Sequence, residues 1–316
     1  MMDKIKILKD KISSAKHIVI AGHKNPDGDA ICSALALMRI IELNFGKQAT
    51  VIYDGNIPRF LREIPLRESA DFYAHLPENA KFDLCILVDY GTRSHLGGAE
   101  KFADAAKFVI EFDHHFNDDC VGDLCFDDAD KAATTQIVYD VVRAAGFKTD
   151  QDVIDLLTLG LITDTGNFKF VKSSDVLIDA ANLVDAGADM AHLMNLLNNR
   201  DKKAVLVETK AVANAEFFMR GRLAIATITT EDYKKLDGRG ELALGLLGQM
   251  HSVEYAVLLK EQKENQIGIS LRSKTNPINK IAESFGGGGH LCAAGAVVKD
   301  SLEHVHDKII SAFKGM

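Results

Sequence analysis

Four short polar segments contain the residues whose types and spacing could do chemistry. Each combines carboxylates or imidazoles with an apolar run just before it. The segments are "HKNPDGD" (His23, Asp27 and Asp29), "VDYG" (Asp89), "DHH" (Asp113, His114 and His115) and "TDTG" (Asp164). Carboxylates and imidazoles without a thiolate suit Mn²⁺ or Mg²⁺, and imidazole favours manganese, iron or cobalt over magnesium. The set exceeds the needs of one ion and predicts two, about 3.5–4 Å apart, bridged by a carboxylate and a water.

Such a pair of ions would convert the bridging water into a hydroxide nucleophile and stabilise charge on a transferring phosphoryl group. Each segment alone also has a structural interpretation. Asp27 and Asp29 suit a turn and a helix N-cap, and Asp89 could satisfy an amide at a strand end. A histidine pair is often found on a surface, and "TDTG" could be a turn. Four such coincidences at equivalent positions are improbable together, which favours the metal centre.

The elements that position these segments alternate between strands and helices. Strands are expected at 17–22, 48–55, 82–91 and 108–115, and the principal helices at 30–45, 134–146 and 150–166. This alternation predicts an α/β fold with a parallel sheet covered by helices on both faces. Ligands of such sheets bind outside the carboxyl ends of the strands. Each polar segment falls at a strand's carboxyl end or at a helix end, so we expect them to converge.

The pattern changes near residue 190. The stretch 190–215 is long and helical with few breakers, and it could bridge two domains. Beyond it, strands are expected at 222–230, 254–262, 266–273 and 293–298, and helices at 240–250, 278–286 and 301–314. We therefore expect a catalytic domain at 1–190, a helical linker at 191–214 and a smaller C-terminal α/β domain at 215–316. The active site is expected in the cleft between the two domains.

A glycine-rich segment, "SFGGGGHLCAAGA", lies in the smaller domain. It contains Gly286, Gly287, Gly288 and Gly289, followed by His290. Consecutive glycine amides can approach a ligand closely and cradle an anion. Arg272, a few residues upstream, could grip a phosphate in bidentate fashion. A hinge or tight turn is the alternative interpretation, and the spacing does not match the Rossmann or P-loop patterns.

Charge and composition exclude several classes of protein. The net charge of −8 argues against a broad electrostatic grip on long duplex nucleic acid, but allows a short anionic substrate in a pocket. No signal peptide and no run of 18 apolar residues occurs, so we expect a cytoplasmic protein without a membrane partner. The five cysteines form no CxxC pair, and reduced thiols are the simplest interpretation. Cys120 and Cys125 could be zinc ligands, but the nearby carboxylates offer a harder site.

Together these motifs resemble the DHH phosphoesterase superfamily, and specifically its DHH/DHHA1 subfamily. "HKNPDGDA", "VDYG", "DHH" followed by Asn117, and "TDTG" look like the four N-terminal motifs. "GGGGH" with "AAG" looks like the DHHA1 signature. Within the family, the two-domain length is similar to that of the NrnA-type oligoribonucleases, which also act as 3'-phosphoadenosine-5'-phosphate phosphatases.

The resemblance implies roles for individual residues. One metal would be held by His23, Asp27 and Asp89. The other would be held by Asp29, Asp89, His114 and Asp164, with Asp89 bridging. His115 would contact the scissile phosphate or assist proton transfer, and Asp113 would orient the histidine pair. The terminal phosphate or nucleotide of the substrate would be bound by Asn117, Arg272, Ser273, Gly286, Gly287, Gly288, Gly289 and His290. The two ions would be Mn²⁺, with Mg²⁺ or Co²⁺ as alternatives.

One motif departs from the family pattern. Similar proteins continue the second motif as D-T-x-D-x-x-R-x-G, whereas this chain reads "DYGTRSHLGG". His95 stands where an arginine is usual, Thr92 replaces an acidic residue, and Arg93 lies two residues before the arginine position. Asp89 is intact, so the change bears on substrate preference or on an ion pair.

The expected function is therefore that of a manganese-dependent phosphoesterase. It would release 5'-mononucleotides from RNA of a few nucleotides, or convert 3'-phosphoadenosine-5'-phosphate to AMP. A phosphodiesterase for linear or cyclic dinucleotides and an exopolyphosphatase are alternatives with the same site. A catalytically idle nucleotide-binding module is the alternative outside enzymes. The sequence leaves open whether the protein forms a homodimer.

Overall fold

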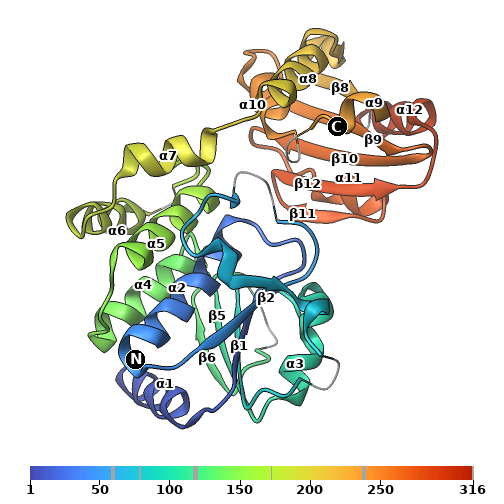
Figure 1. The fold of residues 1–316 in the computed structure, drawn as a ribbon. Coiled ribbons are helices and arrows are strands. Elements are labelled where there is room, and N and C mark those ends of the chain that lie inside the picture. Colours follow the sequence, from blue (N-terminus) through green and yellow to red (C-terminus); the bar gives the residue numbers. More distant parts are fainter. Residues whose placement is uncertain (58–60, 78–79, 117–119, 172, 237–239, 315–316) are drawn as a thin grey trace. The chain divides into compact units, whose positions relative to one another are not determined.

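The computed structural model describes residues 1–316 except 58–60, 78–79, 117–119, 172, 237–239 and 315–316. The chain divides into two compact units, Met1–Asn199 and Arg200–Met316 (Figure 1). The domain limits proposed from the sequence remain a prediction, and the division between the units falls inside the predicted linker.

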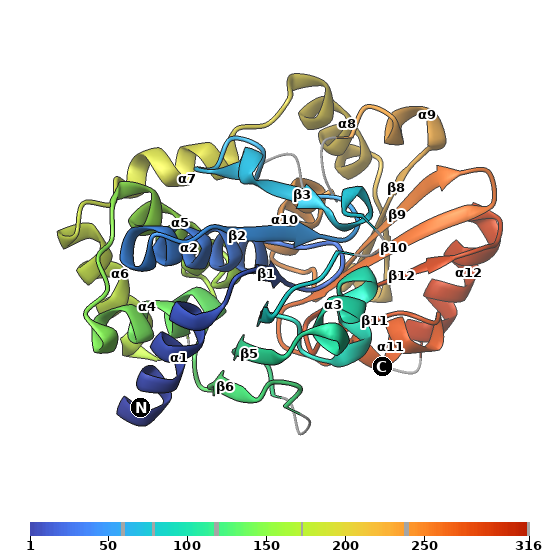
Figure 2. The ribbon, with the colours of Figure 1, turned by 60° about the horizontal axis from the view of Figure 1, so that its bottom comes forward.

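The first unit is built on a parallel sheet in the strand order β3-β2-β1-β4-β5-β6 (Figure 2). Its strands are β1 (Ile18–Ala21), β2 (Ala49–Tyr53), β3 (Ala70–Phe72), β4 (Leu84–Val88), β5 (Phe108–Asp113) and β6 (Leu124–Asp127). The sequence did not predict β3 and β6, which are short edge strands. The direction in which successive strands are added reverses beside β1, which lies between β2 and β4. Such a reversal opens a crevice at the carboxyl ends of the strands.

Helices cover both faces of this sheet, as the sequence predicted. One face packs against α1 (Met2–Ser14), α2 (Gly28–Phe45), α4 (Thr134–Ala145) and α5 (Gln151–Asp164). The opposite face packs against α3 (Glu100–Ala105) and the 3₁₀ segment Arg93–Ala99. Strand β1 serves both cores, because Ile18 and Ile20 face one layer while Val19 and Ala21 face the other. The polar residues that follow these strands are consequently held by a rigid, two-sided core.

Two separate helices, α7 (Met190–Asn198) and α8 (Lys202–Ala213), replace the long helical stretch expected at 190–215. Helix α6 (Ser174–Asp185) precedes them. The helix breaks because Asp201 adopts an extended backbone and its carboxylate caps the amide of Lys203. Leu197 of α7 is buried in the core of the first unit, whereas Val207 of α8 is buried in that of the second. Each helix therefore belongs to one unit.

The second unit contains a mixed sheet in the order β11-β12-β10-β9-β8-β7. Its strands are β7 (Glu216–Phe218), β8 (Leu223–Ile228), β9 (Tyr255–Lys263), β10 (Gln266–Ser273), β11 (Gly288–His290) and β12 (Ala293–Val298). Neighbouring strands are antiparallel except β8 and β9, which are parallel. Helices α8 and α10 (Glu241–Gln249) cover one face, and α11 (Asn279–Ser284) and α12 (Leu302–Phe313) cover the other. A four-residue helix, α9 (Thr230–Tyr233), follows β8. Among the described residues, no helix has the length and apolarity needed to cross a bilayer.

The glycine-rich segment is only partly a loop. Gly288–His290 forms the short strand β11, which pairs antiparallel with β12. A Cβ atom at position 287 would lie 2.0 Å from the carbonyl oxygen of Gly295, so the backbones approach too closely for any side chain. Gly286, with a φ of +75°, also occupies the left-handed region that favours glycine. Packing within the unit thus explains part of the glycine content.

Candidate metal centre

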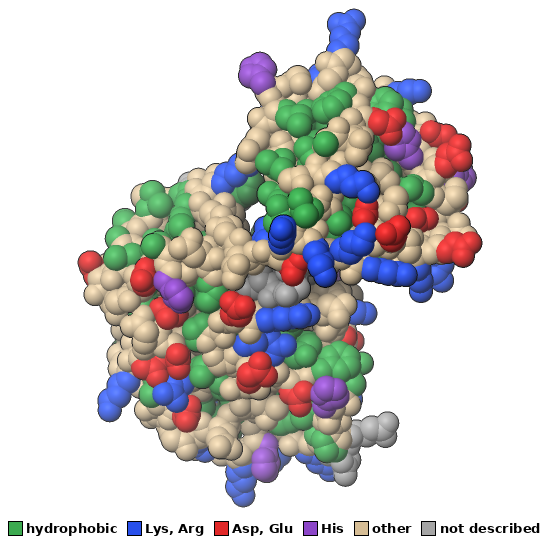
Figure 3. Space-filling model, turned by 45° about the horizontal axis from the view of Figure 1, so that its top comes forward, with side chains coloured by type: hydrophobic (Ala, Val, Ile, Leu, Met, Phe, Trp, Pro, Cys, Tyr) green, Lys and Arg blue, Asp and Glu red, His purple; other side chains and the backbone are tan. Residues whose placement is uncertain are grey.

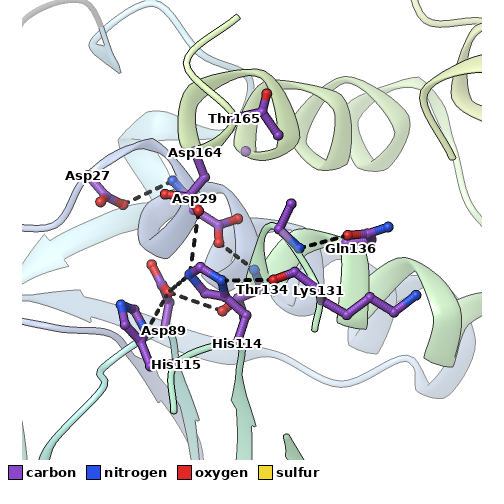
Figure 4. Close-up of polar contacts among 12 residues, drawn as sticks. Asp27, Asp29, Asp89, His114, His115, Lys131, Thr134, Gln136, Asp164 and Thr165 are labelled. Carbon is purple, nitrogen blue, oxygen red and sulfur yellow. Dashed lines mark hydrogen bonds and ion pairs between the residues drawn. The ribbon is translucent and has the colours of Figure 1, made fainter. Parts of the chain in front are cut away.

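The four polar segments of the first unit meet at the carboxyl edge of its sheet (Figure 4). Strand β4 lies between β1 and β5, so the residues that follow these three strands are neighbours in space. Asp89 comes directly after β4 and Asp113 ends β5, while Asp164 is the last residue of α5. The structure therefore brings together side chains that are far apart in the sequence.

His23, Asp27 and Asp89 form the first group of potential ligands. The His23 Nε2 atom lies 3.6 Å from Asp27 Oδ1 and 3.9 Å from Asp89 Oδ2. Its Nδ1 atom contacts the carbonyl oxygen of Lys24 at 2.9 Å, which orients the ring with Nε2 toward the carboxylates. Two ligand atoms that bind one ion at right angles, each about 2.1 Å from it, lie about 3 Å apart. A small movement of the His23, Asp27 and Asp89 side chains toward one another would therefore let them share one ion.

Asp29, His114 and Asp164 form the second group. The His114 Nε2 atom lies 3.5 Å from Asp164 Oδ2 and 3.4 Å from Asp89 Oδ1. The two oxygens of Asp89 thus face different groups, because Oδ2 is directed at His23 and Oδ1 at His114. A carboxylate in this position is suited to bridging two ions.

Asp27 also has a structural role. It is the N-cap of α2, and its Oδ1 atom accepts hydrogen bonds from the amides of Asp29 and Ala30. The N-cap interpretation and the ligand interpretation are therefore compatible at this residue. The neighbouring Gly28 is the first residue of α2, and a Cβ there would lie 2.3 Å from the Thr163 side chain. Gly28 is needed for the close crossing of α2 and α5.

Asp29 is completely buried and is held by the start of helix α4. Its Oδ1 atom accepts hydrogen bonds from the amide and hydroxyl of Thr135 at 3.0 and 2.7 Å, and its Oδ2 atom from the amide of Thr134 at 2.5 Å. The N-cap residue of α4 is Ala133, whose side chain cannot cap a helix. Asp29 therefore caps α4 from another element. Sequence reasoning missed both threonines, although a helix that starts at "ATT" without a capping side chain was a usable signal.

Asp89 is buried in a strained turn. Its φ of +51° lies in the left-handed region, and its amide donates to the carbonyl of Phe112 at 2.9 Å. The Asp113 carboxylate supports the turn by accepting from the amides of Tyr90 and Gly91 at 3.1 and 2.7 Å. Strained backbone of this kind persists where the surroundings fix it, and it clusters at functional sites.

Asp113 also holds one histidine of the pair. Its Oδ1 atom lies 2.7 Å from Nδ1 of His115 and accepts from the His115 amide at 2.9 Å. Burial alone would raise the pKa of Asp113, but the hydrogen bond from His115 and the backbone donors outweigh it and lower that pKa. His114 is oriented instead by the carbonyl oxygen of Lys131, 3.3 Å from its Nδ1 atom. The structure therefore places Asp113 on His115 and not on both histidines.

The electrostatics of the cluster favour a bound cation. Burial, followed by the charges of neighbouring carboxylates, raises the pKa of Asp89 well above its ordinary value. Burial also raises the pKa of Asp29, although His114 and the Thr135 hydrogen bonds oppose it. Divalent cations would relieve this crowding of negative charge, and the oxygen and nitrogen donors fit hard or borderline ions.

Comparison with known proteins shows which family the chain belongs to. A model of the DHH family N-terminal domain matches residues 17–161, and a model of the DHHA1 domain matches residues 221–315. A bifunctional oligoribonuclease and PAP phosphatase of Thermus thermophilus is 31% identical over 94% of this chain and 89% of its own length. The chain belongs to the DHH family.

Two further matches describe the range of DHH relatives. A cyclic-di-AMP phosphodiesterase of Listeria monocytogenes is 26% identical over 96% of this chain, which covers 48% of that protein. The crystal structure of an exopolyphosphatase-related protein from Bacteroides fragilis has a TM-score of 0.91 at 22% identity, covering 100% of this chain and 96% of that one. The latter match shows that the fold is shared.

The predicted substrate residues of this DHH protein lie mainly in its second unit. Arg272 and Ser273 end strand β10, where the Arg272 Nη1 atom donates to the carbonyl of Leu271 at 2.9 Å. The hydroxyl of Ser273 donates to the carbonyl of Asn276 at 2.5 Å. His290 ends strand β11, and Asn117 lies outside the described residues.

Arg93 does not replace the arginine expected at position 95. Its guanidinium pairs with Glu100 at 2.8 Å and with Asp104, both on α3. His95 supplies its carbonyl oxygen to the amide of Lys24 at 2.6 Å, next to His23. The backbone of His95, which stands where an arginine is usual, therefore supports the segment that carries His23 and Asp27.

The cysteines differ from the sequence expectation in one place. Cys120 and Cys125 are joined in a disulfide, whereas Cys32, Cys85 and Cys292 are reduced. The two sulfurs come together because residues 121–124 turn back over Glu111 of strand β5, whose carboxylate accepts the amides of Val121 and Gly122.

Proposed function

We propose that this DHH protein is a metal-dependent phosphoesterase. It hydrolyses oligoribonucleotides of a few nucleotides to 5'-mononucleotides, converts 3'-phosphoadenosine-5'-phosphate to AMP, or does both. The observation that carries the proposal is the position of Asp89, whose two carboxylate oxygens face two separate groups of potential ligands. The Thermus thermophilus relative, an oligoribonuclease and PAP phosphatase, supports the substrate class.

Two divalent cations, Mn²⁺ in the first place, would be held by His23, Asp27 and Asp89 and by Asp29, Asp89, His114 and Asp164. When bound, they supply Lewis acidity that activates water and neutralises charge on a phosphoryl group. The residues of the chain do the positioning. Thr134 donates its hydroxyl to Asp89 at 3.1 Å, and the start of α4 fixes Asp29, so both carboxylates are pre-oriented.

His115 is proposed to contact the scissile phosphate or to move a proton. The carboxylate of Asp113 at its Nδ1 atom favours the tautomer with a proton on Nδ1. Either role, phosphate contact or proton transfer, then falls to Nε2. This arrangement resembles other histidines whose orientation is set by a buried carboxylate.

The second unit is proposed to bind the terminal phosphate or nucleotide of the substrate. A Cβ atom at Gly286 or Gly288 would meet nothing within 4 Å, so the backbone there is open to a ligand. Consecutive amides of this kind can cradle an anion. On the face shown in Figure 3, the first unit carries scattered acidic and basic side chains, and the second unit carries several basic side chains close together. The net charge of −8 supports a short substrate over an extended one.

A phosphodiesterase for linear or cyclic dinucleotides is the second candidate. It is favoured by the cyclic-di-AMP phosphodiesterase of Listeria monocytogenes, which matches over 96% of this chain. Both candidates need the same ligands and differ in how the substrate is held.

A substrate panel tests both candidates. The full-length protein is freed of metal with a chelator, resupplied with Mn²⁺, and assayed on pApA, 3'-phosphoadenosine-5'-phosphate, cyclic di-AMP and polyphosphate. We expect Mn²⁺-dependent turnover of the first two. Turnover of cyclic di-AMP, or of pApA without 3'-phosphoadenosine-5'-phosphate, would favour the second candidate, and release of phosphate from polyphosphate alone would overturn both. Binding of nucleotide without turnover of any substrate would indicate an idle binding module.

A further inference from the structure

A second cluster of potential ligands lies at the edge of the sheet, on strands β5 and β6. Ligand atoms of Glu111, Cys120, Cys125 and Asp127 all lie within 4.8 Å of one another, and the centre described above uses none of these residues. Glu111 is paired in register with Cys125 on the neighbouring strand, and Asp127 lies two residues further along. Side chains two apart on a strand share a face, so the register itself directs these three groups to one side of the sheet.

Glu111 is the most deeply buried carboxylate of this cluster. Its side chain is completely buried, its Oε1 atom makes no hydrogen bond of normal geometry among the described residues, and the hydroxyl of Tyr90 and the carboxyl of Asp127 interact with it. Its Oε2 atom accepts from the amides of Val121 at 3.0 Å and Gly122 at 2.9 Å, which fixes the direction of the carboxylate. A buried carboxylate that is not fully hydrogen-bonded is costly and is stabilised by a donor or a cation.

The loop before β6 is shaped to lie over Glu111. A Cβ atom at Gly122 would be 3.0 Å from the Cβ of Glu111 and 3.3 Å from the sulfur of Cys125, so glycine permits the close approach. The sulfurs of Cys120 and Cys125 lie 3.5 and 4.0 Å from Glu111 Oε2. Lys4 donates to the backbone carbonyl of Cys125, on strand β6, at 2.7 Å.

The disulfide carries no charge and no proton, so it does not neutralise the negative charge that Glu111 and Asp127 bring together. Reduction by a dithiol transfers two electrons and two protons to the sulfurs, giving two thiols, while the reductant becomes a disulfide. Two thiolates beside two carboxylates form a donor set typical of a thiophilic ion such as Zn²⁺.

We propose that the reduced form of this cluster binds one divalent thiophilic cation, Zn²⁺ in the first place, through Cys120, Cys125, Glu111 and Asp127. The set supplies four protein ligands, which is typical of a closed structural zinc site. The carboxylate of Glu111 gains a cationic partner, and binding releases the two thiol protons. This site is distinct from the centre beside Asp89, whose ligands are oxygens and nitrogens. It does not depend on the proposed function.

Cobalt is the probe that separates the two sites. Thiolate-to-cobalt charge transfer absorbs strongly in the near ultraviolet, and only a site with cysteine ligands produces it. Full-length protein reduced with a dithiol, then freed of metal and of the dithiol, is titrated with Co²⁺. We expect the band to reach the intensity of one thiolate-bound ion per chain, in addition to any Co²⁺ bound without a band by the centre beside Asp89, and to disappear when Zn²⁺ is added. Protein oxidised to the disulfide should show no band.

Variants complete the test. The double variant Cys120→Ser/Cys125→Ser should lose the band, and Glu111→Gln should weaken Co²⁺ binding about tenfold or more. Cys292→Ser, which removes a reduced cysteine of the second unit, is the matched control and should retain the band. Absence of the band in the reduced native protein, or its persistence in the double variant, would overturn the proposal. The comparison of reduced with oxidised native protein keeps the test decisive if a variant fails to fold.

Discussion

The predicted site residues of the two units differ in how far packing and hydrogen bonds within each unit explain them. In the first unit, Asp29 and Asp89 are buried carboxylates whose pKa is raised, and the surrounding donors do not balance the crowded charge. In the second unit, Gly287 is explained by the backbone of Gly295, and the Ser273 hydroxyl bonds to a nearby carbonyl. Crowded, buried carboxylates therefore suit a bound cation, whereas a run of glycines can be satisfied by packing alone.

The largest expected effect comes from removing the carboxylate shared by the two ligand groups. Asp89→Asn should reduce Mn²⁺-dependent hydrolysis about 10³-fold or more, because both ions lose an anionic ligand. Steady-state assays on the preferred substrate measure this loss. The matched control is Asp71→Asn, which alters an exposed aspartate paired with His75 at 2.7 Å outside the site. Comparable activity of Asp89→Asn and Asp71→Asn would contradict the metal centre.

Asp29 and Asp27 should differ both in stability and in metal binding. Asp29→Asn turns an amide NH₂ toward backbone N–H groups of α4, which should lower the free energy of unfolding by about 1–3 kcal/mol. Asp27→Asn retains a good N-cap and should change it by less than about 0.5 kcal/mol. Chemical denaturation without metal gives these values.

Calorimetric titration with Mn²⁺ then tests the division of ligands. Each variant should weaken one binding event, and the event affected should differ between the two. If both variants lose the same event, the assignment of Asp27 and Asp29 to separate ions is wrong.

A pair of glycine variants tests whether packing alone explains the glycine-rich segment of the second unit. Gly287→Ala should destabilise the protein by about 1–3 kcal/mol, because its Cβ would meet the Gly295 carbonyl. Gly288→Ala meets nothing within 4 Å and should leave the melting temperature unchanged. If the segment also binds substrate, Gly288→Ala should raise KM with little change in kcat. An unaltered KM would leave packing as the role of these glycines.

The smallest effect is a pH dependence of the metal-free protein. Burial raises the pKa of Asp89, so the folded state binds protons more tightly than the unfolded state. Stability from this group is therefore greatest below the ordinary carboxyl pKa of about 4 and is lost as pH rises through the raised value. As pH rises above the ordinary carboxyl pKa, the melting temperature of chelated native protein should fall relative to that of Asp89→Asn. Added Mn²⁺ should reverse the difference, and a constant difference across pH would contradict the raised pKa.

Much of the fold and of the candidate centre could be predicted from residue patterns. Buried strands followed by polar residues indicated a parallel sheet, and the carboxyl ends of parallel strands meet at one edge. The convergence of His23, Asp89 and His114 therefore required only the order of elements. The short edge strands β3 and β6 and the break at Asp201 were missed, because three or four residues carry too little periodicity and one cap can end a helix.

What the sequence by itself determined is the chemistry on offer, namely which carboxylates and imidazoles follow which buried elements. Only the tertiary structure decided how each group is supported. Thr134 and Thr135 hold Asp29 from positions 105 and 106 residues along the chain, and Arg93 turns to α3 instead of the site. The gathering of Glu111, Cys120, Cys125 and Asp127 likewise depends on β5, β6 and their loop together. Burial and hydrogen bonding across elements are properties of the packed chain, so no local pattern contains them.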